Sequence, residues 1–564
     1  MNRISTLLCL YLAIGSQVTA QTFNFHTSFD SSFVPGGNYL LVGKISDNYL
    51  LLYSDKEHPT KLVICDQKGA VLREKTYDFI NDSSTVAVNL VPGKTIWSLV
   101  LQSVVGNIHY TETVKLDANG EILKGREKID STRHDKFQSA AIYNMTSSRN
   151  GEYFLLYRIL RGFATDHLVI DYILLDKSAN KIGSKSFFIP FKEQFEALNN
   201  IFLAPDGTVY FTVHDKALGY RLGSKLRLYE SDLASQEPTK SEIILNENMP
   251  IEIAFDADPT NKFIALGVLY ANYNTKIPDG ILTVFYNPAT NRVETIANLP
   301  MEKDFKKEMK KRNINAKQLA AMTKLEFFKV NPDKSVSIVA DIVSSRNDIR
   351  VGVPNGFYTS QPAPSIGTSS SQSFDQMRNN LYETQLPGSN AIGTSVAYPL
   401  TYRPQTMPDW NRQMNWNQSE TLGNTLWQET YNSNYQNNFA SAVKNSQMVL
   451  KSIVFKLDVN HKLQWKNLAQ NSYVPNSPFT SVKTISIGNN VSLLSYEFEE
   501  NSGVFLQQQN FGSNGKIATQ PIGTSRMPLL FHGGNMLSFG EREILTIYFD
   551  PVEYRVGLAS IVWQ

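Results

Sequence analysis

Residues that commonly carry protein chemistry are thinly spread along this chain of 564 residues. None of the eight histidines has another histidine at the i, i+2 or i, i+4 spacing that suits metal ligands, and the HExxH motif of zinc peptidases is missing. The sequence Asp256-Ala257-Asp258-Pro259 resembles the start of a calcium loop. It lacks the glycine and the distal carboxylate of such a loop, so we predict a turn here and no metal site.

Nucleophiles and phosphate-binding loops give no clearer signal. Cys65 ends an apolar run and is predicted to be a small buried hydrophobe. Three Ile-Gly-Thr-Ser sequences do not form the Gly-x-Ser-x-Gly elbow of serine hydrolases, and neither a GxxxxGK(S/T) loop nor a CxxC pair is present. Paired carboxylates of a glycoside hydrolase would meet only in the folded chain, and the sequence nominates no pair. We predict no catalytic residue and no cofactor, which leaves enzyme activity open but disfavoured.

Short apolar runs and tight turns recur along the chain at a spacing of roughly fifty residues. In one unit, an Asn-Gly turn precedes the apolar runs 153–157 and 168–175, and the turn 176–180 leads into Ile182. A period in this range is typical of propellers and solenoids. The sequence therefore predicts an all-β fold, a β-propeller, as a single domain over residues 21–564.

The apolar runs group into eight four-stranded blades, with seven as the close alternative. Residues 263–266 are apolar on both faces, which favours stacked blades over an outer-membrane barrel whose strands alternate. The last unit is one strand short, and residues 23–29 can supply that strand. Such closure would join the first and last blades and remove the open sheet edges between them.

Charge and composition narrow the possible partners. The net charge is +2 and the sequence pI is near 8.2, with lysines and arginines scattered along the chain. A nucleic-acid-binding protein would concentrate its basic residues on one face, so we expect no nucleic-acid partner. The aromatic content of 11% suits half-buried pleated surfaces.

Residues 1–20 have the organisation of a secretory signal peptide. Arg3 supplies the positive charge, an apolar run follows, and a Val-Thr-Ala cleavage site ends at Ala20. The apolar run is too short to span a bilayer, so we expect an exported protein with no transmembrane segment after cleavage. The expected location is the periplasm or the periphery of the outer membrane, with secretion as the alternative. Cleavage would leave Cys65 as the only cysteine and therefore no internal disulfide.

Two segments interrupt the repeat, and the first is helical in pattern. Residues 301–323 place apolar side chains four residues apart, as in Met301, Phe305 and Met309, and a short second helix is expected near the end. Six lysines and arginines lie within residues 303–312. They would suit an anionic membrane surface or an acidic partner. Acidic residues are interleaved with them, so the sequence favours a solvated helix face crossed by local ion pairs.

The second interruption, residues 344–447, is a long insertion rich in Asn, Gln, Ser and Tyr and poor in charge. A loop this long inside a compact unit is normally functional or disordered. Its candidate binding residues are Trp410, Trp416, Trp427, Tyr431 and Tyr435. Exposed Trp and Tyr give a large contact area at a low entropy cost, which suits a protein-binding arm. The alternative, with equal weight, is a partly disordered loop whose aromatic residues pack onto the propeller rim.

The repeated hairpin resembles the outer hairpin of many β-propeller repeats, as in Leu-Asp-Ala-Asn-Gly-Glu-Ile at 116–122 and Phe-Lys-Leu-Asp-Val-Asn at 455–460. The resemblance covers nearly all of the chain after the signal except the helix and the insertion, and it implies the propeller architecture. The Trp-Asp dipeptide of one propeller class and the double glycine of another are missing from the equivalent positions, so no family residues are carried over. The Asn-, Lys- and Tyr-rich composition with a cleavable signal also looks like envelope proteins of the Bacteroidota.

Two functions remain open at this point. The first is an exported, non-enzymatic scaffold or accessory subunit that binds a partner protein in the cell envelope, such as an outer-membrane protein or a secretion complex. The second is a propeller enzyme, or a glycan- or small-ligand-binding protein, that works at the central axis. Convergent carboxylates or histidines at the axis would favour the second function, and a protruding insertion would favour the first. The oligomeric state stays unknown.

Overall fold

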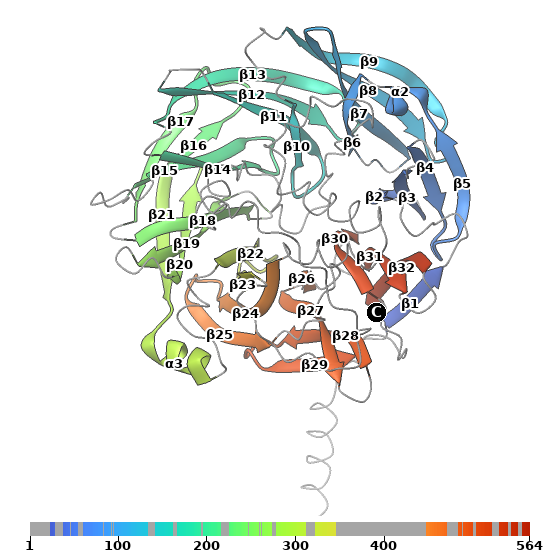
Figure 1. Cartoon of the computed structure of the whole chain (residues 1–564). Coiled ribbons are helices and arrows are strands. Elements are labelled where there is room, and N and C mark those ends of the chain that lie inside the picture. The colour runs from blue at the N-terminus through green and yellow to red at the C-terminus, as the bar shows by residue number, and fades with distance from the viewer. Residues whose placement is uncertain are drawn as a thin grey trace, which may run out of the picture.

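The computed structural model describes residues 23–28, 38–345 and 447–563, apart from shorter stretches within these ranges, of which the longest are 134–141, 216–224, 312–321, 471–482 and 522–529. In this part of the chain, eight four-stranded antiparallel sheets are arranged as blades around a central axis (Figure 1). The predicted β-propeller is therefore confirmed, with eight blades rather than seven.

The first four blades follow one another along the chain. Blade 1 contains β2 (Asn38–Ile45), β3 (Asn48–Ser54), β4 (Lys61–Cys65) and β5 (Val71–Thr76). The short helix α2 (Asp78–Asn81) leads to blade 2, which contains β6 (Thr85–Val91), β7 (Ile96–Val105), β8 (Ile108–Asp117) and β9 (Ile122–Arg133). Blade 3 contains β10 (Asn144–Ser147), β11 (Tyr153–Arg161), β12 (His167–Asp176) and β13 (Lys181–Pro190). Blade 4 contains β14 (Glu196–Leu203), β15 (Val209–Asp215), β16 (Lys225–Ser231) and β17 (Thr239–Ile244).

The last four blades include the helix and both ends of the insertion. Blade 5 contains β18 (Asn248–Ala257), β19 (Ile264–Asn272), β20 (Pro278–Asn287) and β21 (Arg292–Pro300), and α3 (Lys303–Lys311) follows it. Blade 6 contains β22 (Met322–Val330), β23 (Val336–Ser345), β24 (Gln447–Leu457) and β25 (Leu463–Gln470). Blade 7 contains β26 (Lys483–Ile487), β27 (Asn490–Glu499), β28 (Gly503–Phe511) and β29 (Ile517–Pro521). Blade 8 contains β30 (Leu530–Phe539), β31 (Glu543–Asp550), β32 (Arg555–Trp563) and β1 (Phe23–Ser28).

Within each blade the strand order runs from the axis to the rim, as Figure 1 shows. The middle strands are buried on both faces because each blade is packed between two others. In β20, eight of the ten residues are buried, whereas the rim strand β21 is mostly exposed. This explains the uninterrupted apolar runs in the sequence, since a strand covered on both faces needs no polar alternation.

The hairpin that joins the third and fourth strands of a blade repeats one local structure. In blade 2, Oδ1 of Asp117 accepts hydrogen bonds from the backbone N–H groups of Asn119 and Glu121, both at 2.8 Å. Gly120 has φ of +76°, a conformation that glycine adopts without strain. Asp66, Asp176 and Asp458 accept the corresponding pair of bonds in blades 1, 3 and 6. These turns are the repeat signal that the sequence carries.

The ring is closed by strands from the two ends of the described chain. Strand β1 pairs antiparallel with β32, with Phe23 opposite Trp563 and Ser28 opposite Leu558. This confirms the strand predicted from residues 23–29. A second contact joins blade 8 to blade 1, because Glu543 forms an ion pair with Lys44 at 2.8 Å.

Two features differ from the sequence-based expectation. The helical segment expected over 301–323 extends too far, because Met322 and Thr323 already belong to β22. Its first helix is α3, and the short second helix expected near its end falls on residues 312–321, outside the described part. The innermost strands of several blades were also missed. They carry polar and irregular positions, such as the bulge between Pro250 and Glu252 in β18, that disturb an apolar pattern. Among the described residues, no helix has the length and apolar character needed to cross a membrane.

Candidate functional site

The two faces of the propeller carry different connections. Because neighbouring strands are antiparallel, the hairpins between strands one and two and between strands three and four of each blade lie on one face, here called the turn face. The connections between strands two and three, and those between blades, lie on the opposite loop face. In blade 3 the turn-face hairpins are tight, with Gly151 N–H bonded to Ser148 O and Ala179 N–H bonded to Asp176 O, both at 2.9 Å.

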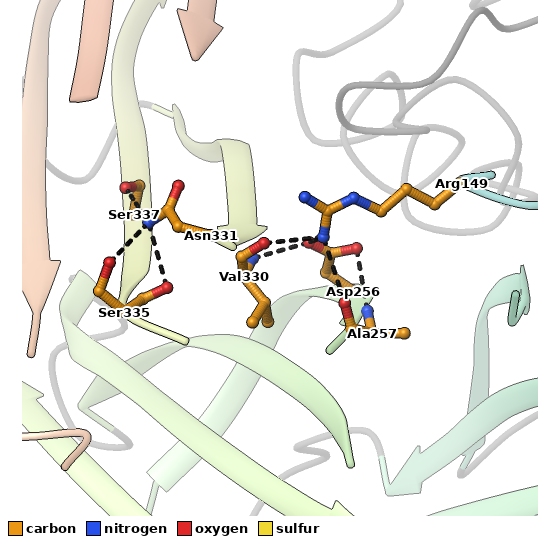
Figure 2. A network of polar contacts seen from close by, with 7 residues as sticks. All are labelled: Arg149, Asp256, Ala257, Val330, Asn331, Ser335 and Ser337. Atoms are coloured by element: carbon orange, nitrogen blue, oxygen red, sulfur yellow. Dashed lines mark hydrogen bonds and ion pairs between the residues drawn. The ribbon is translucent and has the colours of Figure 1, made fainter. Parts of the chain in front are cut away.

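A buried ion pair on the turn face joins three blades beside the axis (Figure 2). Arg149 lies in the hairpin between β10 and β11 of blade 3, and its Nη1 donates to Oδ2 of Asp256 in blade 5 at 2.9 Å. The same nitrogen lies 2.7 Å from the carbonyl oxygen of Val330, at the end of β22 in blade 6. It also lies 3.2 Å from the carbonyl oxygen of Ala257. One guanidinium therefore ties together the ends of inner strands from non-adjacent blades.

The carboxylate of Asp256 has a complete set of partners. Its Oδ2 also accepts a hydrogen bond from Val330 N–H at 2.7 Å, and its Oδ1 accepts one from Ala257 N–H at 2.9 Å. Burial raises the pKa of Asp256, while the Arg149 guanidinium and the two backbone amides act in the opposite direction. Because Asp256 is only 3% exposed, removing Arg149 would leave a buried carboxyl group without its counter-charge.

Acidic side chains on β18 also accept hydrogen bonds from the unpaired backbone edge of β22, the innermost strand of the next blade. Besides the bond from Val330 to Asp256, Leu325 N–H donates to Oε2 of Glu252 at 2.6 Å. The inner edge of a blade has backbone N–H groups that no further strand can pair with. Glu252 and Asp256 supply the missing acceptors from the adjacent blade. Their acidity at these positions therefore has a structural reason.

The polar contacts continue from blade 6 into blade 7. The amide nitrogen of Asn331 donates to the Ser335 carbonyl oxygen at 3.1 Å and to the Ser337 hydroxyl at 2.9 Å. Lys456 Nζ lies 3.1 Å from the same Ser337 hydroxyl and donates to the carbonyl oxygen of Asn489 in blade 7 at 2.6 Å. Burial lowers the pKa of Lys456 to about 8. We call Arg149, Asp256, Asn331, Ser337 and Lys456 the turn-face network.

A different buried carboxyl group lies toward the loop face of blade 6. Asp341 on β23 is 2% exposed, and its Oδ1 accepts a hydrogen bond from the Ser452 hydroxyl at 2.5 Å. Burial raises its pKa well above the usual range, and the nearby Glu326 carboxylate adds to the effect. Asp341 therefore favours the neutral form. It lies four residues before Ser345, the last residue of β23.

The five aromatic residues proposed as a binding surface, Trp410, Trp416, Trp427, Tyr431 and Tyr435, lie outside the described residues. The structure does place the two ends of the segment that contains them. Ser345 and Gln447 are cross-strand partners at the loop-face end of the β23–β24 ladder. Residues 346–446 thus leave and re-enter blade 6 at one position, on the face opposite the turn-face network.

Other residues considered for chemistry are engaged in hydrogen bonds, ring stacking or core packing. Among the described residues, no group of three or more His, Cys, Asp or Glu side chains is placed to hold a metal ion. Asn199 and His214 share a hydrogen bond of 2.6 Å, and His461 stacks on Phe285 with ring centres 3.5 Å apart. Cys65 is buried in β4, as its sequence context predicts. The expected turn after Asp256 is present, with Asp258 N–H bonded to the Phe263 carbonyl oxygen at 3.0 Å.

Sequence reasoning missed the turn-face network for an identifiable reason. Arg149 and Asp256 are 107 positions apart, and each lies in a segment that by itself predicts only a turn. Lys456 and Asn489 are separated in the same way, by 33 positions. These contacts could have been predicted only with knowledge of which strands lie next to one another in the folded ring. Blade order alone does not give this, because the contact from blade 3 passes over blade 4.

No known family and no curated protein matches the chain. Solved structures resemble its fold. The WD40 domain of SCAP from fission yeast is 8% identical with a TM-score of 0.37, and the match covers 96% of this chain and 98% of that one. The Dos1 propeller is 8% identical with a TM-score of 0.39, covering 96% and 95%. A putative 6-phosphogluconolactonase from Bacteroides fragilis is 11% identical with a TM-score of 0.32, covering 88% and 98%. Likenesses this low carry no argument about function.

Proposed function

We propose that this protein is an exported propeller scaffold that binds a partner protein in the cell envelope through the segment 346–446. The observation that carries the proposal is the pairing of Ser345 with Gln447 at the end of the β23–β24 ladder. Both ends of the segment are held by one sheet, so whatever the segment binds is attached to the propeller at a single rigid position. Its tryptophans and tyrosines suit a protein interface.

The surroundings of this anchor support the proposal. On either side of the ladder, Ile338, Ala340 and Ile342 of β23 and Ile453 of β24 are fully buried in the core between blades. The hydrogen bond from Ser452 to Asp341 adds a polar contact between the two strands. A force applied to the segment would therefore act on the packed interior of blade 6 rather than on an isolated hairpin. Such an anchor is what a scaffold requires.

The contacts at the axis fit the same function. Arg149 and Asp256 neutralise one another, and both also bond to backbone atoms of inner strands. Lys456 is likewise bonded to Ser337 and to a backbone carbonyl. Groups used in this way hold the ring together. This supports a scaffold over an enzyme or a ligand-binding protein that works at the axis.

The test is a crosslinking pull-down from the native envelope with a tagged full-length chain. A variant that lacks 350–445 retains both residues of the Ser345–Gln447 pair, and thermal melting establishes that its fold is intact. A second variant, Trp410→Ser, Trp416→Ser and Trp427→Ser, retains the length of the segment. We expect both variants to lose the same specific partner. Sequencing the mature N-terminus, expected at Gln21, tests export.

The control is a variant with three exposed lysines on the turn face replaced, Lys68→Gln, Lys462→Gln and Lys516→Gln, which should recover the partner as the wild type does. Recovery of the same partners by all variants would overturn the proposed role of 346–446. In that case the axis, and a ligand or substrate bound there, would be the next place to look.

A further inference from the structure

The helix α3 stands outside the ring of blades, between blades 5 and 6 (Figure 1). It is fixed there by one apolar contact. Phe305 is 6% exposed and packs into the same core cluster as Met301, together with residues of blades 5 and 6 such as Leu299 and Leu468. The helix therefore has a defined orientation on the propeller. One side faces the blades and the other faces outward.

Two ion pairs hold acidic groups on the side of the helix that faces the blades. Lys306 forms an ion pair with Asp279 of β20. Glu302, which precedes the helix, pairs with Lys466 of β25 at 3.2 Å, and this lysine also lies 5.1 Å from the centre of the Phe305 ring. Of these two carboxylates, Glu302 is one that the sequence alone would assign to neutralising the helix.

The outward side of α3 carries four of its lysines. At about 100° per residue, Lys303, Lys307, Lys310 and Lys311 fall within an arc of roughly 100° on the side opposite Phe305. All four are exposed, and Lys307 has a side-chain exposure of 75%. The acidic residues Asp304 and Glu308 fall on the flank of this arc. The exposed 3.2 Å pair of Asp304 with Lys307 links this flank to the arc. We call the four lysines the α3 basic face.

We propose that the α3 basic face is an electrostatic contact with an anionic membrane surface, and that it sets how the propeller lies against the lipid. Charge complementarity identifies the partner, since clustered lysines next to a surface attract anionic lipid headgroups. The use of lysine rather than arginine favours anionic lipid over an acidic protein as the partner of this face. Lysine is a point charge without the planar fork with which arginine recognises individual carboxylates. A helix that stands out from the rim also presents a convex contact, which suits a flat surface better than a protein groove.

This inference rests on the envelope location in the proposed function, but it needs neither the partner nor residues 346–446. The probe is therefore a pair of lipid vesicles, one of phosphatidylcholine alone and one that also contains phosphatidylglycerol. Sedimentation of the purified full-length protein measures the partition coefficient. We expect binding to the anionic vesicles only, and its loss in about 0.5 M salt, because charges at an exposed surface are screened.

The test variant carries Lys303→Gln, Lys307→Gln, Lys310→Gln and Lys311→Gln. Its partition coefficient onto anionic vesicles should fall on the order of a thousandfold, as expected for four surface charges. The matched control, Lys68→Gln, Lys124→Gln, Lys462→Gln and Lys516→Gln, removes the same charge from exposed positions elsewhere and should bind as the wild type does. Thermal melting checks that both variants are folded.

Three results would overturn the inference. The wild-type protein could fail to bind anionic vesicles, which would leave an acidic protein as the partner of the helix. The two lysine variants could lose binding equally, so that only the total charge matters. The variant lacking 350–445 could lose vesicle binding while the α3 variant retains it, which would assign the membrane contact to that segment. The pull-down for the proposed function has an independent outcome in each case.

Discussion

The turn face and the loop face of this propeller are built on the same strands but hold them together differently. On the turn face, short hairpins and the turn-face network connect blades that are far apart in sequence, as when Arg149 of blade 3 reaches Asp256 and Val330. On the loop face, Ser345 and Gln447 mark the point at which a long segment leaves one blade and returns to it. The difference is consistent with the proposal that the turn-face contacts hold the ring together and that the segment 346–446 on the loop face binds a partner.

Two further buried ionisable groups, one toward each face, have opposite charge. Lys456 belongs to the turn-face network, and burial lowers its pKa to about 8. Asp341 lies toward the loop face, and burial raises its pKa well above the ordinary value. In both cases the folded state favours the neutral form of the group. The stability contributions of Lys456 and Asp341 should therefore respond to pH in opposite directions.

The largest expected effect comes from breaking the ion pair of the turn face. Arg149→Met should lower the free energy of unfolding by about 3 kcal/mol, because it leaves the Asp256 carboxyl group buried without its counter-charge. Urea unfolding followed by tryptophan fluorescence measures the change. Adding Asp256→Asn should recover part of the loss, since the second substitution removes the unpaired charge.

A nearby ion pair is the control for this prediction. Lys177 and Glu152 form an exposed pair at 2.7 Å on the same face of blade 3. Exposed pairs add little to stability, so Lys177→Met should leave the unfolding curve almost unchanged. Equal losses from Arg149→Met and Lys177→Met would contradict the structural role given to the turn-face network.

Shortening the loop-face segment should act in the other direction and by less. Closing a shorter connection between Ser345 and Gln447 has a smaller entropy cost, so the variant lacking 350–445 should be more stable by up to about 2 kcal/mol. The same urea measurement tests this. A clear loss of stability would mean that residues 346–446 supply packing to the ring, and the contrast between the faces would then be weaker.

The pH dependence of the stability that Asp341 contributes tests the loop-face part of this comparison. Its raised pKa means that the folded state holds a proton that the unfolded state releases near pH 4. Stability should therefore fall as pH rises from about 4 through the folded-state pKa. Asp341→Asn keeps a group that can bond Ser452 and does not titrate, so the difference in stability between wild type and variant should change over this window. A constant difference would show that Asp341 is ionised in the fold.

The smallest effect is expected for Lys456 on the turn face. Its pKa falls from an ordinary 10.5 to about 8, so between these values the unfolded state binds the proton more strongly. Stability should rise with pH across this window, the opposite trend to that of Asp341. Thermal melts of wild type and Lys456→Gln at pH values from about 7 to 10 give the difference. A difference that does not vary would place the Lys456 amine in a more solvated environment.

The sequence could predict the ring because its signals are local. In blades 1, 2, 3 and 6 the outer hairpin carries an Asp whose carboxylate accepts two backbone bonds within four residues, as in Asp117, Asp176 and Asp458. The buried middle strands add uninterrupted apolar runs. Even the closing strand could be proposed, because an unpaired edge in the last blade requires one.

The candidate sites could not be predicted in the same way, because they depend on which blades meet. Nothing close to Asp256 in sequence indicates Arg149, which lies 107 positions away. For the helix after blade 5, the sequence favoured local neutralisation of its bases. The fold has one such local pair, Asp304 with Lys307, but pairs Glu302 with Lys466 of another strand. The sequence therefore predicted the helix over Lys303–Lys311 correctly but not the long-range partner of the acidic residue before it.

The pairing of β1 with β32 has a consequence for the order of folding. The strand at Phe23–Ser28 cannot pair until its partner strand, Arg555–Trp563, has been synthesised. In a chain made from its N-terminus, this first strand therefore stays unpaired while the other blades form. Ring closure is then the last assembly step and the one of highest contact order, which makes it slow. Until that moment blade 8 has an open edge, and this interval is when the chain is most exposed to aggregation.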